Sequence, residues 1–190
     1  MCEVNDKMYQ VSTLQALALG YFKKVVTVKE LLEHGNTGLG TFTNIDGEMI
    51  VLDSKAYRAG GDGTVIEADG DTGVPFASVG YLHNEQKIPL NETEDVQLLK
   101  KLLNNRIEEW FGLNSIHVAR IDGEFDLIDA RSEDMHVSDH VELKTALSKN
   151  QKSFIFENVK GSLVCVYYPD FMDGINASGW HFHFISEARK

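Results

Sequence analysis

The segment that most constrains the fold is a long amphipathic stretch in the middle of the chain, NETEDVQLLKKLLNNRIEEWFG at residues 91–112. Its apolar residues recur at three- and four-residue spacing, which is typical of one face of an α-helix. These residues are Leu98, Leu99, Leu102, Leu103, Ile107, Trp110 and Phe111. Gly112 supplies a helix stop. The pattern predicts one long helix, and we interpret its apolar face as core rather than as a groove for a partner.

Segments on both sides of this helix are rich in strand-forming residues. Residues 41–53, TFTNIDGEMIVLD, and residues 117–130, HVARIDGEFDLIDA, each predict two strands around an Asp-Gly pair, which is a strong hairpin signal. A third pair of strands is predicted around Lys160-Gly161, between SFIFENV and SLVCVYY. The repeated IDGE indicates either an internal duplication or a common hairpin tip that occurs twice.

Two short helices are expected near the N-terminus. Each begins at a hydroxyl residue followed three positions later by Gln or Glu, at Ser12 and Gln15 and again at Thr27 and Glu30. Strands before and after a long helix predict a mixed α+β fold, with β-rich sheets built of hairpins and a few helices. We expect two sheet-containing lobes, residues 1–90 and residues 91–190.

Composition excludes several classes of protein. A hydrophobic content of 43% in 190 residues is enough to fill a core, while a net charge of -11 without a basic stripe argues against a nucleic-acid binder. No stretch approaches the ~20 consecutive apolar residues of a membrane helix, and the first residues do not resemble a signal peptide. We therefore expect a cytoplasmic protein. Cys2 and Cys165 do not indicate a disulfide framework, and Cys165 is expected in the core.

The last predicted strand carries the residues with the clearest chemistry, in the run Trp180-His181-Phe182-His183-Phe184. Side chains alternate between the faces of a strand, so both histidines project together and the three aromatic residues project to the other side. Two imidazoles on one face can bind zinc, copper, iron or nickel. The alternative is a strand whose solvent face carries two histidines by chance.

Three further residues are candidates for a site. Thr41 and Glu48 flank the first Asp-Gly turn, where Glu48 is either a proton donor or a solvated hairpin residue. Arg131 follows a predicted strand and either pairs with a substrate carboxylate or lies on the surface.

Taken in order, five blocks of the sequence resemble the α-acetolactate decarboxylase family, from Tyr9 to Arg189. The blocks are YQVSTLQALALGYF, TVKELLEHGNTGLGTFTNIDGEMIVLDSKAYR, GVPFASVGYL, NSIHVARIDGEFDLIDARS and KGSLVCVYYPDFMDGINASGWHFHFIS. The combination GLGTF, DGE and LD is specific for the family, and GWHFHFIS resembles its metal-binding strand. The resemblance implies a zinc-dependent, homodimeric carboxy-lyase that converts 2-acetolactate to acetoin and CO2.

The resemblance also implies roles for individual residues. Zinc would be bound by His181, His183 and a third histidine on a following strand, which this sequence lacks. Glu48 would supply a carboxylate, Arg131 a guanidinium and Thr41 a hydroxyl near the substrate. A second glutamate of the family, near its C-terminus, has no counterpart here. The run after Arg131, MHVSDHVEL, also differs from the Gln-x-x-Pro-Tyr-like run usual in the family.

The missing ligand leaves several expectations. Loss of one imidazole of three is expected to weaken zinc binding by several kcal/mol, since a complete structural site contributes roughly 10–16 kcal/mol. We expect the protein either to continue beyond Lys190 or to be a defective homologue. The remaining histidines show no ligand spacing and are expected mostly on the surface, although one of them could fold back as a replacement ligand: His34, His83, His117, His136 and His140.

Two other functions stay open from the sequence. His181, His183 and Glu187 nearly match the first metal motif of cupins, which would make Glu187 the third ligand of an oxygenase, an isomerase or a metal-dependent binding module. The chain could also be a non-catalytic descendant that keeps the fold to bind a small ligand.

Overall fold

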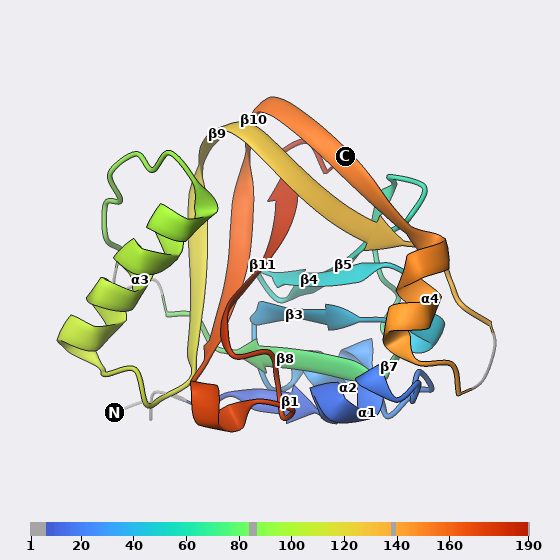
Figure 1. Ribbon diagram of the computed structural model, residues 1–190. Coiled ribbons are helices and arrows are strands. Elements are labelled where there is room, and N and C mark those ends of the chain that lie inside the picture. The colour runs from blue at the N-terminus through green and yellow to red at the C-terminus, as the bar shows by residue number, and fades with distance from the viewer. Residues whose placement is uncertain (1–6, 84–86, 138–139, 190) are drawn as a thin grey trace.

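A computed structural model describes residues 7–83, 87–137 and 140–189, and it confirms the mixed α+β fold. Within these residues a six-stranded sheet lies against a three-stranded sheet, with short helices and one long helix around them (Figure 1). The strands are β1 (Tyr9–Val11), β2 (Val26–Thr27), β3 (Thr37–Thr41), β4 (Glu48–Leu52), β5 (Lys55–Ala59), β6 (Val65–Glu67), β7 (Gly73–Val74), β8 (Phe76–Gly80), β9 (His117–Glu133), β10 (Gln151–Tyr168) and β11 (Gly179–Ser186). The helices are α1 (Leu14–Ala18), α2 (Val28–Leu32), α3 (Val96–Trp110) and α4 (Leu143–Asn150).

The six-stranded sheet is antiparallel throughout, in the order β1-β8-β3-β4-β5-β6. Its central strand β3 is completely buried. A Cβ atom on Gly38 would lie 2.0 Å from the carbonyl oxygen of Ser78 in β8. Only glycine permits this close approach of two strands, so the small residues of TGLGT set the spacing at the centre of the sheet.

The first predicted hairpin is confirmed. β3 and β4 pair from Gly38 opposite Val51 to Thr41 opposite Glu48, and the Asp46-Gly47 pair lies in the connection between them. Gly47 has a φ of 82°, a left-handed conformation that favours glycine. The turn therefore places Glu48 at the first position of β4.

The two other predicted hairpin tips are wrong. Gly123 lies inside β9 and pairs directly with Gly161, which lies inside the equally continuous β10. Strand-forming residues continue on both sides of each glycine, so the chain gains more ladder hydrogen bonds by running straight on than by turning. The two IDGE copies consequently have different structures.

The reversal between β9 and β10 is made by a connection that contains α4, a helix that the sequence analysis missed. The two strands form a long ribbon that rises above the rest of the molecule before they reach α4 (Figure 1). The C-terminal part of β10 pairs with β9 along one edge and with β11 along the other. Its residues from Ser162 to Tyr168 are buried.

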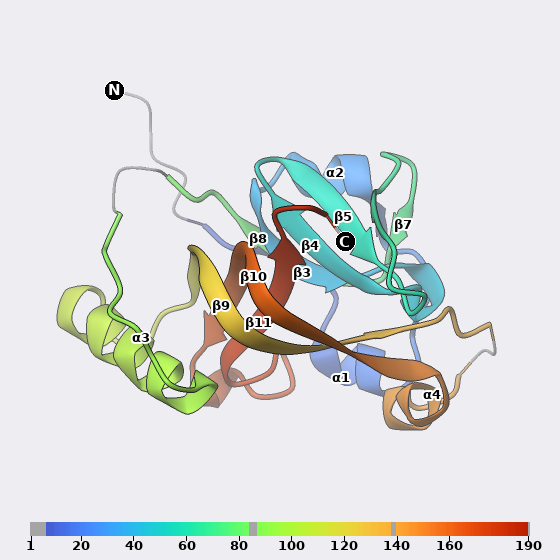
Figure 2. The same cartoon turned by 90° about the horizontal axis from the view of Figure 1, so that it is seen from above.

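The long central helix is confirmed. Asp95 caps it, with Oδ1 accepting hydrogen bonds from the backbone N–H groups of Gln97 and Leu98. Three of its predicted core residues pack on the three-stranded sheet, namely Leu99, Leu103 and Ile107, whereas Leu98, Trp110 and Phe111 are exposed. In both views α3 covers the face of this sheet that points away from the six-stranded sheet (Figures 1 and 2).

The short N-terminal helices are also confirmed, with one shift. Thr13, not Ser12, caps α1, because its hydroxyl accepts a hydrogen bond from the N–H of Ala16. Thr27 and Glu30 form the expected reciprocal cap of α2.

The two sheets share apolar contacts. Ile50, Leu52 and Tyr57 of the larger sheet contact Val164 and Ile185 of the smaller one, and Leu39 contacts Val166 and Tyr168. One sheet lies within residues 9–80 and the other within residues 117–186, while a boundary at residue 90 stays a prediction. In the described residues, no helix is long and apolar enough to cross a membrane.

The two Asp-Gly glycines should respond differently to substitution. In Gly47→Ala, the alanine would have to adopt a positive φ, and its Cβ would lie 2.4 Å from the carbonyl oxygen of Ala59. We therefore expect a loss of roughly 1–3 kcal/mol of unfolding free energy. Gly123→Ala is the matched control, since a Cβ there meets no atom within 4 Å. Urea unfolding of both variants checks this, and equal losses would contradict the assigned turn.

Candidate metal centre

The two histidines of β11 face the larger sheet, and their ring nitrogens meet. His181 lies opposite Val166 and His183 opposite Val164 of β10. Their Nε2 atoms are 3.2 Å apart. Trp180, together with Phe182 and Phe184, packs on the other face, in the cluster beneath α3. The alternation predicted for this strand is therefore confirmed.

His183 is fixed by a hydrogen bond to the neighbouring sheet. Its Nδ1 lies 2.8 Å from the carbonyl oxygen of Met49 in β4, and because a carbonyl can only accept, Nδ1 carries the proton. The Nε2 lone pair is then directed towards Nε2 of His181 and towards Glu48 Oε2, which is 3.3 Å away.

Both imidazoles are held in the neutral form that metal binding requires. Burial lowers the pKa of His183 to about 4, against the upward effect of the Met49 hydrogen bond. His181 is exposed, yet its pKa is also lowered, first by the loss of hydration at its ring and then by the charges of His183 and Lys100.

These residues fit a divalent transition metal. In a tetrahedral zinc site with Zn–N distances of about 2.0–2.1 Å, two ligand nitrogens lie about 3.3 Å from each other. This is close to the separation of the two Nε2 atoms. A backbone carbonyl bonded to the second nitrogen of a ligating histidine is a common outer partner in metal sites. Across the described ranges, no group of three His, Cys, Asp or Glu side chains is placed to hold an ion.

Glu48 is the carboxylate beside the histidines. It is the first residue of β4, and its side chain is 27% exposed at the mouth of the site. Loss of hydration raises the pKa of Glu48 to about 8. Thr41 lies opposite it in the ladder, but the Thr41 hydroxyl donates to the carbonyl oxygen of Gly47 at 2.9 Å and so closes the turn that precedes Glu48.

The structure does not bring the Arg131 side chain to this cluster. Arg131 is exposed on β9, and no described residue forms a hydrogen bond or an ion pair with its guanidinium. The two residues that follow it in the chain, Ser132 and Glu133, are buried next to the Glu48 end of β4 instead. A substrate-binding role for Arg131 stays a prediction.

Glu133 is a site residue that the sequence analysis missed. It is only 2% exposed, and its Oε2 is buried without a hydrogen-bond partner among the described residues. Burial raises the pKa of Glu133 to about 9, and the charges of Glu48 and Asp46 add to this effect. The only sequence signal was its place two residues after Arg131, because the apolar alternation of the strand does not extend this far.

Glu187 does not complete a metal site. It follows β11, is exposed, and lies four residues from His183, about 13 Å along an extended strand. Its backbone N–H donates to the carbonyl oxygen of Lys160 at 2.8 Å. The strand does not bend back, so the cupin-like arrangement is not formed.

The other histidines also lie apart from the pair on β11. His34 stacks on Tyr9 and His83 on Tyr81, His140 meets the edge of Tyr21, His117 contacts Ser115, and His136 contacts Asn150. Three of these five are exposed and two, His117 and His136, are half-buried. None of them folds back as a replacement ligand in the described structure.

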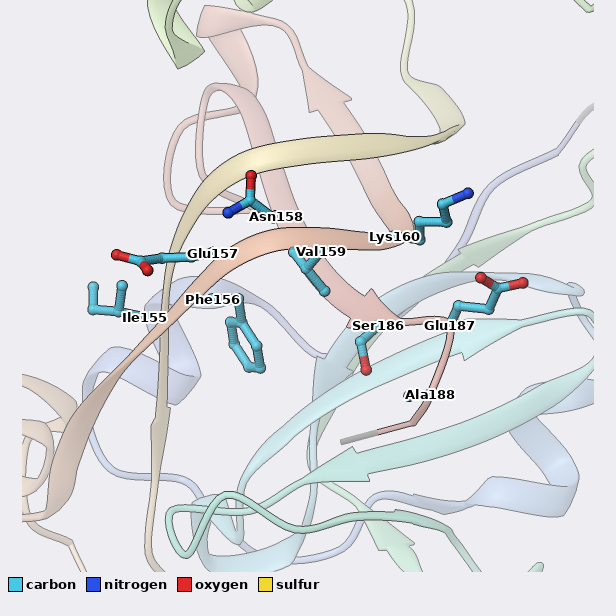
Figure 3. Close-up of a pocket in the computed structure, with 9 residues that line it drawn as sticks. All are labelled: Ile155, Phe156, Glu157, Asn158, Val159, Lys160, Ser186, Glu187 and Ala188. Atoms are coloured by element: carbon cyan, nitrogen blue, oxygen red, sulfur yellow. The ribbon is translucent and has the colours of Figure 1, made fainter.

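A surface hollow of about 570 Å³ lies near the far end of β11 and is separate from the site (Figure 3). Residues 155–160 of β10 and residues 186–188 line it. Neither histidine of the pair nor Glu48 contributes to its wall. Glu187 lines the hollow without the histidines, so the hollow gives no support to a metal site that combines Glu187 with them.

The buried carboxyl of Glu133 predicts a pH-dependent stability. Its pKa in the folded protein is above the ordinary value of 4.5, so the stability that it contributes is complete below about pH 4.5 and is lost as the pH rises towards about 9. Glu133→Gln stays neutral throughout. We expect it to gain about 1–3 kcal/mol relative to the wild type between pH 5 and pH 9.

Denaturant unfolding of zinc-free protein at several pH values measures this difference. Glu157→Gln, which changes an exposed glutamate, is the control. A Glu133→Gln difference that is the same at pH 5 and pH 9 would show that the carboxyl is not held protonated.

Comparison with known proteins extends over almost the whole chain. The family model for alpha-acetolactate decarboxylase matches residues 8–190. An alpha-acetolactate decarboxylase of Methanosarcina mazei is 35% identical over 97% of this chain, and one of Lactococcus lactis subsp. lactis is 38% identical over 98% of it. The chain spans 63% and 77% of the length of these two relatives.

A solved structure shares the fold. The crystal structure of alpha-acetolactate decarboxylase from Bacillus subtilis superposes with a TM-score of 0.89 at 30% identity, covering 96% of this chain and 76% of that one. With the family match and the relatives above, this agreement shows that the chain belongs to the alpha-acetolactate decarboxylase family.

Proposed function

We propose that this protein decarboxylates 2-acetolactate to acetoin and CO2 with the help of a zinc ion. The observation that carries the proposal is the meeting of the two Nε2 atoms, 3.2 Å apart, beside the carboxyl group of Glu48. Family membership and the names of the relatives support the substrate and the reaction.

The histidines would hold the metal. His181 and His183 present Nε2 atoms to the same point, and the hydrogen bond from His183 to Met49 keeps the proton on the opposite nitrogen. When bound, zinc would supply a Lewis acid that stabilises negative charge developing on substrate oxygens, an effect worth several kcal/mol.

Glu48 is the proton donor of the proposal. When the carboxylate of acetolactate leaves as CO2, the electrons of the broken bond stay on the remaining fragment, which must gain a proton at carbon to become acetoin. A carboxyl whose pKa is raised to about 8 is protonated at neutral pH and can give that proton. The half-open position of Glu48 allows solvent to restore the proton afterwards.

Thr41 and Arg131 have different parts in the proposal. The Thr41 hydroxyl fixes the turn before Glu48, which orients the carboxyl without requiring contact with the substrate. Arg131 would bind the substrate carboxylate only after its exposed side chain moved towards the site, so its role rests on the family resemblance. A homodimeric, cytoplasmic protein is likewise part of the proposal on that ground.

Two imidazoles bind zinc less tightly than three. We therefore propose weak zinc retention by residues 1–190, with activity that depends on added metal.

Removing the proposed proton donor should abolish turnover but not metal binding. We expect Glu48→Gln, in zinc-supplemented buffer, to lower the rate of acetoin formation about 100- to 10,000-fold, because the amide cannot give up a proton. Acetoin assays and elemental analysis of zinc check both parts. Glu124→Gln, an exposed glutamate in an ion pair with Lys160, is the control.

Full activity of Glu48→Gln would remove Glu48 from the mechanism. A wild-type protein that binds zinc and acetolactate but releases no acetoin would instead identify a small-ligand binder.

Removing one imidazole should weaken zinc binding. Even an outer partner of a metal ligand contributes about 10- to 100-fold in affinity, so we expect His181→Ala to weaken zinc binding by more than about 100-fold. Competition with a chelating dye measures the affinity, and His117→Ala is the control because His117 lies outside the pair. An unchanged affinity in His181→Ala would place the zinc elsewhere.

A further inference from the structure

Glu48 occupies a position that its own sheet constrains weakly. It lies opposite Ala59 in the first pair of the β4–β5 ladder, directly after the turn at Gly47. Strand ends open more readily than strand centres, because they have paired neighbours on one side only. A carboxyl that must meet a histidine of another sheet therefore needs a further constraint here.

The hydroxyl of Ser132 supplies a contact to both members of this first pair. Its Oγ donates to the carbonyl oxygen of Ala59 at 2.6 Å and accepts from the backbone N–H of Glu48 at 3.3 Å. Ser132 is only 3% exposed, so water does not compete strongly for either bond.

Ser132 reaches this point because the end of β9 is attached to the turn after β5. The backbone N–H of Gly61 donates to the carbonyl oxygen of Glu133 at 3.0 Å. A Cβ on Gly61 would lie 2.5 Å from the backbone nitrogen of Asp134, so the two chains approach as closely as glycine allows. The position of the Ser132 hydroxyl is thus set by main-chain contacts.

Met49, the residue after Glu48 in β4, is also bonded to the smaller sheet, through β11. The carbonyl oxygen of Met49 accepts from His183 of β11, while the N–H of Glu48 donates to Ser132 of β9. Both partners belong to the three-stranded sheet, in which β10 joins β9 to β11. Neighbouring residues of β4 are therefore tied to the same sheet that carries the histidine pair.

We propose that Ser132 is a positioning residue, whose hydroxyl holds the backbone of Glu48 so that its carboxyl stays beside Nε2 of His183. The inference rests on the proposed function of Glu48. Ser132 itself does not touch the substrate; it acts only through the main chain of Glu48.

Three variants test this inference in the full chain. Ser132→Ala removes the hydroxyl, and Ser132→Thr retains it. Ser162→Ala is the matched control, because Ser162 is also a buried serine of the three-stranded sheet, 7% exposed, whose hydroxyl bonds to Asp122 rather than to β4. The measurements are kcat and KM for acetolactate with added zinc, zinc affinity, unfolding free energy, and hydrogen exchange of the Glu48 amide.

For Ser132→Ala we expect kcat to fall about tenfold or more with KM nearly unchanged, because small misplacements of a reacting group are costly. The Glu48 amide should exchange at least about tenfold faster, because its acceptor is gone. Zinc affinity should match that of the control, and Ser132→Thr should restore amide protection.

The inference is overturned if Ser132→Ala leaves kcat and Glu48 exchange at the level of Ser162→Ala. Equal losses of kcat and of unfolding free energy in Ser132→Ala and Ser162→Ala would overturn it as well, since they would indicate general destabilisation. A wild-type protein without acetoin formation would refute the proposed function, and the exchange of the Glu48 amide would then decide alone whether Ser132 holds this strand end.

Discussion

The hydrogen bond from His183 to the carbonyl oxygen of Met49 joins the two sheets, and the chemistry of the candidate site depends on it. His183 is 8% exposed, so a donor at Nδ1 without a partner would cost about 1–3 kcal/mol. The bond avoids this cost and leaves the other nitrogen free as a lone pair. Packing of Ile50 on Val164 and Ile185 keeps water away from this contact. The core between the sheets and the orientation of the proposed metal ligand are thus two results of one interface.

The same interface determines the charge of the site. Burial raises the pKa values of Glu48 and Glu133 and lowers that of His183, so each of these groups favours its neutral form. Among the nearby acids, Asp46 is neutralised by Arg58 at 2.7 Å. Neutral side chains at the site would not repel an anionic substrate, and the zinc ion that we propose would supply the positive charge. The formal net charge of the whole chain, -11, therefore says little about the electrostatic field at the site.

The sequence predicted the features that depend on neighbouring residues, namely which face of a strand or helix a side chain occupies. Strand alternation placed His181 and His183 on one face, and the spacing of Leu99, Leu103 and Ile107 placed α3 on the core. The Asp-Gly signal failed at Gly123, because a dipeptide cannot show that a partner strand continues past it on both sides. Glu133 was not foreseen because its burial depends on where the end of β9 meets the larger sheet, and the local sequence does not show such a contact.

The position of Glu48 at a strand end suits the proton donor that we propose. In the middle of β4 the backbone is buried and fixed by two ladders, and a carboxyl there would have no route to solvent. At the first residue the side chain keeps partial exposure, while Thr41 fixes the turn below it and Ser132 the backbone above it. Side chains of β3 and β9 thus add to the order that the two ladders give this strand end. The carboxyl can exchange protons with water without losing its place beside His183.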